Sequence, residues 1–233
     1  CTRARSRHPQ SGEIWRERAR CLLLQGDDAG GGEDLEQAAR LGGETAEAWC
    51  LAGATAYGTR RWAAAAICYD RALAVDGNHV DALFYRAGCA LNQGESEPAV
   101  RGFTRVLELR PDDVDALVFR GAAFRSARQW ERAEADLDRA VKVAPGTEAQ
   151  FQRGLLREER GQVDGALADF ERCVAVEPQN AKAMHHRGLA RMKVGEDRAA
   201  EADFRRAAAL RHSDSFGELA GLYKRQGRID EAR

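Results

Sequence analysis

The feature that most constrains this chain is a small residue that returns about every 34 positions. The intervals between its occurrences are 34, 34, 33, 34 and 32 residues. It stands at Ala65, Ala99, Ala133, Ala166, Ala200 and Ala232. A second small residue recurs twelve positions earlier, for example at Gly53 and Gly188. Such self-similarity at a fixed period is the sequence signature of a stacked array. The 233 residues are therefore expected to extend by repetition rather than around one central core.

Each repeat contains two short amphipathic helices, A and B, joined by a turn, as in Val114–Pro145. Helix B carries one large apolar residue per repeat, at Leu35, Tyr69, Phe103, Leu137, Phe170 and Phe204. The small residues let the two helices approach closely, and the large residue fills the space beside them. A proline such as Pro145 ends the unit because it cannot continue a helix. One pair cannot bury its apolar face alone, so neighbouring pairs must stack.

This pattern resembles the tetratricopeptide repeat family. The unit Ala46–His79 matches its positions with Trp49, Gly53, Ala65, Tyr69 and Ala72. The resemblance covers Gly12–Arg233 and implies an all-α fold, a right-handed α-solenoid of stacked antiparallel helix pairs. Two residues depart from the pattern: Gln150 replaces the large residue of helix A, and Gly31 lies in helix B of the first unit. Their two units are the ones expected to be distorted.

The repeats divide the chain into units at 12–45, 46–79, 80–113, 114–146, 147–180, 181–212 and a partial 213–233. Residues 1–11, with Arg3, Arg5 and Arg7, are predicted as a basic linker, with a basic patch for an anionic partner as the alternative. Because the chain starts at Cys1 and stops within a predicted helix B, we expect a fragment of a longer protein.

A glycine-rich stretch at residues 27–32 lies between the two helices of the first unit. It has no strand before it and no Gly-Lys-Ser/Thr after it, so a phosphate-binding loop is disfavoured. Glycine destabilises helices, so the stretch predicts a loosened turn.

The composition of the chain limits which partners and which cellular compartment are expected. The formal net charge of −1 gives no support for nucleic-acid binding. No apolar run is long enough to cross a bilayer, and no signal peptide is recognised, so no membrane association is expected. The six cysteines form no Cys-x-x-Cys pair. Cys21, Cys89 and Cys173 stand at small-residue positions and are expected to be buried. A reducing, cytoplasmic compartment is expected for the chain, rather than a disulfide framework.

One pattern of charges repeats with the helices. An arginine precedes the small residue of helix A at Arg86, Arg120, Arg153 and Arg187. An aspartate precedes the large residue of helix B at Asp136, Asp169 and Asp203. We predict that these charges pair within or between adjacent units, so that they fix the register of the stack. Arg86 does not fit, because its unit has Gly102 at the aspartate position. The alternative is a set of unrelated, solvated charges.

The candidate binding residues lie on one stripe of helix A, away from the small-residue face. The resemblance implies that this stripe lines a concave groove. Its aromatic members are Tyr57, Phe84, Tyr85, Phe119 and Phe151. Its acidic edge consists of Glu47, Asp81, Asp115 and Glu148. Large apolar residues outside the packing face usually mark an interface. The alternative is that the residues at one shared position, Phe84, Val118 and Phe151, belong to the core.

Several kinds of site are disfavoured. The clamp with which some tetratricopeptide repeat proteins hold a chaperone's C-terminal carboxylate has no counterpart, because its positions carry Arg16, Arg20, Leu51, Asp81 and Tyr85. His185 and His186 are adjacent on a helix and point about 100° apart, so a shared metal is not expected. No nucleophile–base arrangement or His-Glu-x-x-His motif is present, so we expect no enzyme, cofactor or metal centre.

The sequence therefore favours a non-enzymatic interaction module that binds a peptide or helix of a basic, partly apolar protein partner. One alternative is a structural segment of a large ciliary or cytoskeletal assembly. Another is a substrate-delivery or co-chaperone region of a longer protein that carries an enzyme or J-domain elsewhere.

Overall fold

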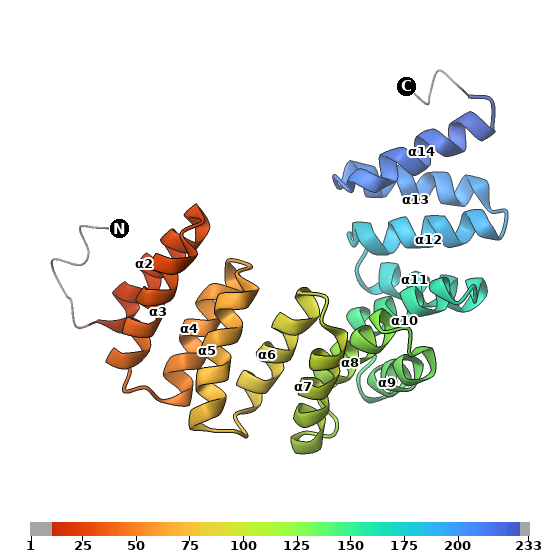
Figure 1. The fold of residues 1–233 in the computed structure, drawn as a ribbon. Helices are drawn as coiled ribbons and strands as arrows, with labels where there is room; N and C mark the ends of the chain where they lie inside the picture. The colour runs from red at the N-terminus through yellow and green to blue at the C-terminus, as the bar shows by residue number, and fades with distance from the viewer. Residues whose placement is uncertain (1–10, 229–233) are drawn as a thin grey trace. The chain divides into compact units, whose positions relative to one another are not determined.

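The computed structural model describes residues 11–228, and all their regular secondary structure is helical (Figure 1). The predicted all-α class is therefore confirmed. The helices are α2 (Gly12–Gln25), α3 (Asp28–Leu41), α4 (Ala46–Gly58), α5 (Trp62–Val75), α6 (Val80–Asn92), α7 (Ser96–Leu109), α8 (Val114–Ser126), α9 (Trp130–Val143), α10 (Thr147–Glu159), α11 (Val163–Val176), α12 (Ala181–Lys193), α13 (Asp197–Ala209) and α14 (Ser213–Arg225).

The helices form two compact units, one ending at Arg128 and the other starting at Gln129. In the first unit, α2 and α3, α4 and α5, and α6 and α7 pack as antiparallel pairs that stack in chain order and are followed by α8 (Figure 1). In the second unit, α9 is followed by the pairs α10 with α11 and α12 with α13, and then by α14. These are the stacked helix pairs of a solenoid.

Short polar side chains start several helices, and residues in the left-handed region end them. The side chains of Thr45, Asp113 and Asn180 each accept a hydrogen bond from a backbone N–H three residues later. After the A helices, positive φ values occur at Gly94 and at its equivalents Gly26, Gly161, Gly195 and Gly227. In two repeats the equivalent residue is an arginine instead, Arg60 or Arg128.

Small residues allow the large ring of helix B to lie directly against the backbone of helix A. A Cβ atom added at Gly53 would lie 2.8 Å from the Tyr69 ring, and one at Gly154 would lie 2.6 Å from the Phe170 ring. These separations are too short for real contacts, so only glycine allows the rings to lie this close. The predicted role of the small residues is confirmed at these positions.

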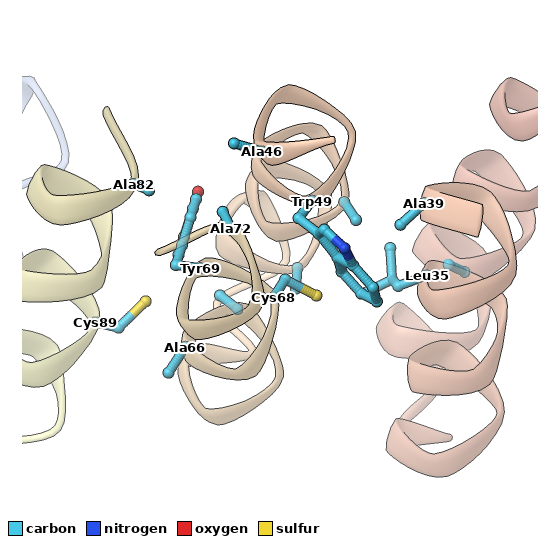
Figure 2. Close-up of a cluster of buried hydrophobic side chains, with 14 of the residues drawn as sticks. Leu35, Ala39, Ala46, Trp49, Ala66, Cys68, Tyr69, Ala72, Ala82 and Cys89 are labelled. Carbon is cyan, nitrogen blue, oxygen red and sulfur yellow. The ribbon is translucent and has the colours of Figure 1, made fainter. Parts of the chain in front are cut away.

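The core of the first unit shows how each pair is joined to its neighbours. Trp49 of α4 points toward Leu35 of α3, whereas Tyr69 of α5 lies on the other side, toward Ala82 and Cys89 of α6 (Figure 2). Burial raises the pKa of the Cys89 thiol to about 11. This cysteine therefore behaves as a small core residue rather than as a reactive thiolate.

The glycine-rich stretch is better ordered than its composition suggests. The predicted loosened turn at residues 27–32 is wrong, because α3 begins at Asp28 and continues through the three glycines. The carboxylate of Asp27 accepts the N–H of Gly30 at 2.9 Å, which caps the helix. A Cβ atom at Gly31 would lie 2.6 Å from Leu23, so this glycine permits close helix packing. The repeat that contains Gln150 was also expected to be distorted, but α10 is a regular helix. The side chain of Gln150 is buried there.

The repeated charges pair as predicted in two repeats of the second unit. Arg153 binds Asp169, and Arg187 binds Asp203, each from helix A to helix B of the same repeat. The first repeat has the same pair between Arg18 and Asp34, which was not among the predicted pairs. The exception, Arg86, binds Asp70 of the preceding repeat at 2.8 Å. The alternative of unrelated, solvated charges is therefore wrong for Asp169 and Asp203.

Two predicted segments cannot be placed. The basic linker, apart from Ser11, and the last five residues of the partial repeat lie outside the described residues 11–228. Within those residues, none of the helices combines the length and the apolar character that a bilayer span requires.

Candidate functional site

Five aromatic side chains of the first unit form a continuous row, the aromatic row: Tyr57, Trp62, Phe84, Tyr85 and Phe119. The ring centroids of Trp62 and Tyr57 are 4.9 Å apart, and those of Tyr57 and Tyr85 are 5.4 Å apart. Phe84 continues the row, with its centroid 5.4 Å from that of Tyr85 and 5.6 Å from that of Phe119. All four contacts are edge-to-face, the geometry that aromatic pairs prefer. The row extends across α4, α5, α6 and α8.

Two rings of the row stack on the helix B ring of the preceding repeat. Tyr85 lies 5.8 Å from Tyr69 with an interplanar angle of 16°, and Phe119 lies 5.9 Å from Phe103 with an angle of 17°. Tyr69 and Phe103 are buried, but Tyr85 remains 40% exposed and Phe119 36%. Each exposed ring therefore packs against a buried ring of the preceding repeat.

The question of groove or core has a different answer at each position. Val118 is 2% exposed and belongs to the core. Phe84 is half-buried, and its ring contacts those of Tyr85, Phe103 and Phe119, so it packs between the two exposed rings. Tyr57 is also half-buried, and desolvation raises the pKa of its hydroxyl. Tyr85 and Phe119 are the members of the predicted set that offer open aromatic surface.

The predicted acidic edge of the first unit is exposed. Glu47, Asp81 and Asp115 are the second residues of α4, α6 and α8. Carboxylates there are stabilised by the positive end of the helix dipole. The pKa of Glu47 is lowered by hydrogen bonds from its own backbone N–H and from the Thr45 hydroxyl. Among residues 11–228, neither Asp81 nor Asp115 takes part in an ion pair.

The two remaining predicted residues, Glu148 and Phe151, belong to the second unit. Exposed Glu148 accepts a hydrogen bond from the Gln152 side chain at 2.9 Å. Phe151 is half-buried and lies 5.8 Å from Phe170 and 5.6 Å from His186. Neither of these two residues offers an open ring like Tyr85 or Phe119.

His186 occupies the place that Tyr85 has in its repeat, stacked 5.4 Å from Phe170 at an angle of 27°. Its Nδ1 lies 2.9 Å from a carboxylate oxygen of Glu158, which also accepts a hydrogen bond from Lys193 at 3.2 Å. Burial would raise the pKa of Glu158, but these two contacts outweigh it and leave the pKa lowered. The helix A surface of the second unit is therefore polar at this point.

A second cluster in this unit joins two histidines through one hydroxyl. The Nδ1 atoms of His185 and His212 each lie 3.0 Å from Oγ of Ser215, which is fully buried. Burial, reinforced by the nearby imidazoles, lowers the pKa of His185 to about 4. Within the described residues, no group of three His, Cys, Asp or Glu side chains is arranged to hold a metal ion.

Two further residues contribute to these clusters and were not predicted from the sequence. Trp62 extends the aromatic row, and its signal was the tryptophan at the same repeat position in the fourth repeat, Trp130. Ser215 links two histidines, and its signal was its spacing of three residues from His212 at the start of a helix.

Comparison with protein families gives matches over most of the chain. Two family models, both described as tetratricopeptide repeat, match this sequence. One matches residues 120–185, and the other matches residues 2–47 and 50–100. The matched residues include most of those that form the aromatic row.

Two curated proteins share part of this sequence. Protein CTR9 homolog of Arabidopsis thaliana is 28% identical over 118 residues, which are 50% of this chain and 11% of that protein. Mitochondrial import receptor subunit TOM70 of Homo sapiens is 29% identical over 108 residues, which are 44% of this chain and 18% of that protein. The chain thus spans less than a fifth of the length of either relative.

Solved structures share the fold at low sequence identity. A tetratricopeptide repeat protein from Parabacteroides merdae aligns with a TM-score of 0.72 and 21% identity, over 96% of this chain and 90% of that one. PilW, a type IV pilus biogenesis factor, aligns with a TM-score of 0.73 and 18% identity, over 80% and 88%. YrrB, described as having an unusual peptide-binding site, aligns with a TM-score of 0.57 and 21% identity, over 78% and 94%.

Proposed function

Since this chain belongs to the tetratricopeptide repeat family, whose fold supports protein–protein interaction scaffolds, we propose that its aromatic row lines a groove that binds a partner polypeptide. The observation that carries this proposal is the exposure of Tyr85 and Phe119, two rings that the packing within each helix pair does not require. Exposed aromatic side chains in a continuous patch usually mark an interaction site.

The stacking of these rings on buried rings favours binding. Each exposed ring is stacked on a buried ring, so little side-chain freedom remains to be lost when a partner binds. Tyrosine and other aromatic residues are also common among the few residues that supply most of the binding energy at interfaces. The exposed rings of the aromatic row therefore offer apolar contacts to a partner in two adjacent repeats.

The charges beside the row indicate the chemistry of the partner. The exposed carboxylates of Glu47, Asp81 and Asp115 favour a basic segment with apolar side chains. The peptide-binding site named for YrrB is consistent with a peptide as the bound form. We infer a non-enzymatic scaffold whose partner is a protein segment, extended or helical.

A display selection tests this function without knowledge of the natural partner. Random peptides are selected on the wild-type chain, and their affinities are then measured by fluorescence anisotropy. We expect selected peptides to bind the wild type and to lose at least tenfold in affinity for the double variant Tyr85→Ala with Phe119→Ala. Circular dichroism and urea unfolding of the variant verify that its helices remain folded.

The matched control is Phe216→Ala, because Phe216 of α14 is 56% exposed and lies outside the predicted groove. It should leave peptide affinity unchanged. The proposal fails if no peptide is selected, or if the selected peptides bind the double variant as tightly as the wild type.

A further inference from the structure

We propose that two repeated pairs of side chains, Asp81 with Tyr85 and Asp115 with Phe119, are subsites that each hold one cationic side chain of the partner. The inference rests on the proposed function and specifies the partner further: its bound segment carries two arginine or lysine residues at a defined spacing. An aspartate followed four residues later by an aromatic residue recurs at the same position in two adjacent repeats.

Each pair places a carboxylate and a ring on one face of a helix. Asp81 precedes Tyr85 by four residues in α6, and Asp115 precedes Phe119 by four residues in α8. Residues four apart in a helix are neighbours on its surface. A guanidinium or ammonium group can therefore contact the ring while its charge faces the carboxylate.

Neither subsite holds a cationic side chain from the described part of the chain. Among residues 11–228, no lysine or arginine lies over Tyr85 or Phe119, and neither aspartate forms an ion pair. The arginines closest in sequence have other partners: Arg86 binds Asp70, and Arg120 lies over Phe124. A ring and a carboxylate without a cation form a site that is complementary to one.

The helix dipole alone does not explain the pairing. It favours an acidic residue at the second position of any helix, and Glu13, Glu47 and Glu148 also occupy that position. In their repeats the residue four positions later is Glu17, Leu51 or Gln152, so no open ring follows. In the sixth repeat, His186 stands in place of the tyrosine or phenylalanine, and Lys182 stands in place of the acidic residue. Acid and open ring occur together only in α6 and α8 among these helices.

The distance between the subsites sets the spacing of the two cations. The centroids of Tyr85 and Phe119 lie 5.4 Å and 5.6 Å from that of Phe84, so the two rings are at most about 11 Å apart. A segment in the polyproline II conformation returns to the same face every three residues, after about 9 Å. In such a segment, two basic residues three positions apart fit within this limit, and we infer this spacing for the partner.

The experiment uses a blocked peptide of about twelve residues that contains two arginines three positions apart, each flanked by leucine. A second peptide has both arginines replaced by citrulline, which keeps the shape and removes the charge. Fluorescence anisotropy on the full chain should show that the citrulline peptide binds at least about tenfold more weakly.

Two double variants of the protein test the same subsites. Asp81→Asn with Asp115→Asn, and Tyr85→Leu with Phe119→Leu, should each weaken binding of the arginine peptide by a similar factor. Leucine preserves apolar contact but removes the ring.

Glu97→Gln is the matched control, because Glu97 is also an exposed acidic residue at the second position of a helix, but in helix B of the same unit. It should leave affinity unchanged. Equal binding of the two peptides, no binding of the arginine peptide, or an equal effect of Glu97→Gln overturns the inference. If peptides from the display selection depend on Tyr85 and Phe119 but lack a basic pair, the inference fails while the proposed function stands. If no peptide depends on these rings, both fail.

Discussion

Arg153 of α10 and Asp169 of α11 form a two-pronged ion pair, in which Nη2 donates to Oδ1 at 2.6 Å and Nε donates to Oδ2 at 3.0 Å. Arg157, one turn later, adds a third hydrogen bond to Oδ2 at 2.7 Å. The side chain of Asp169 is only 2% exposed, so its charge depends on these donors. Asp203 has the same arrangement with Arg187 and Arg191 in the next repeat.

Removing Asp169 should therefore destabilise the second unit strongly. We expect Asp169→Ala to lower the free energy of unfolding by about 3 kcal/mol, because two partly buried arginines lose the buried carboxylate that they share. A double-mutant cycle of Arg153→Ala and Asp169→Ala should give a coupling of about 1 kcal/mol or more in urea unfolding. Arg20→Ala is the control: its pair with Glu17 is exposed, so the effect should stay below about 1 kcal/mol. A coupling of zero would show that Arg153 and Asp169 contribute independently.

The hydroxyl of Tyr69 is buried in the first unit, and residues 11–228 supply no hydrogen-bond partner for it. A buried hydroxyl without a partner is unfavourable by about 1–3 kcal/mol. Tyr69→Phe should therefore leave stability unchanged or raise it by up to about 1 kcal/mol, since three other repeats carry phenylalanine at this position. Urea unfolding measures the change. A loss of more than about 1 kcal/mol would contradict the prediction and indicate a bound water or another partner for the hydroxyl.

Arg60 follows α4 in the left-handed region, with φ of 59°, where five other repeats carry glycine. A residue with a Cβ atom is strained in this conformation by about 1 kcal/mol or more. Arg60→Gly should therefore raise the melting temperature, and Arg128→Gly, where φ is 57°, should do the same. Arg60→Ala separates the backbone effect from loss of the side chain, because alanine keeps the strain. If the alanine variant is as stable as the glycine variant, the strain is not the cause.

The repeat pattern predicted the helices well because packing of small and large residues is encoded locally. Spacing alone identified Gly53, Gly154 and their ring partners, and it paired Arg153 with Asp169. The glycine-rich stretch misled the prediction because low helix propensity was overridden by the Asp27 cap and by contact with Leu23.

The candidate site was only partly predictable. A helical stripe shows which residues share a face, but not how deeply a neighbouring helix covers them. Phe84 and Tyr85 are adjacent, yet the first is half-buried beneath other rings and the second is exposed. Likewise, the contact of Ser215 with His185, 30 residues away in the sequence, depends on tertiary packing.

Buried His185 should make the stability of the second unit depend on pH. The groups that face it are His186 on the same helix, His212 and Asp214 at the start of α14, and Glu158 of α10. Its pKa falls from an ordinary 6.5 to about 4 on folding. Above pH 6.5 the residue is neutral in both states. As the pH falls from 6.5 to 4, only the unfolded chain gains the proton, so about 2–3 kcal/mol of stability is lost.

The measurement is urea unfolding at pH 7.5 and pH 4.5 for the wild type and for His185→Phe. Phenylalanine stands at the equivalent position of two other repeats, as Phe84 and Phe151, so the substitution suits the fold. It should reduce the difference in stability between the two pH values by the amount assigned to His185. An undiminished difference would assign the pH dependence to other groups.

Two glycines within helices of the second unit should respond in opposite ways to the same substitution. A Cβ atom at Gly154 of α10 would meet the Phe170 ring at 2.6 Å, whereas one at Gly221 of α14 would meet nothing within 4 Å. Gly154→Ala should therefore lower stability by about 1–3 kcal/mol through overpacking. Gly221→Ala should raise it by up to about 1 kcal/mol, because alanine restricts the unfolded chain and favours the helix. Both are measured by urea unfolding. The intrinsic helix preference is the same in the two cases, so equal effects would mean that close contact with the ring does not govern the choice of glycine at Gly154.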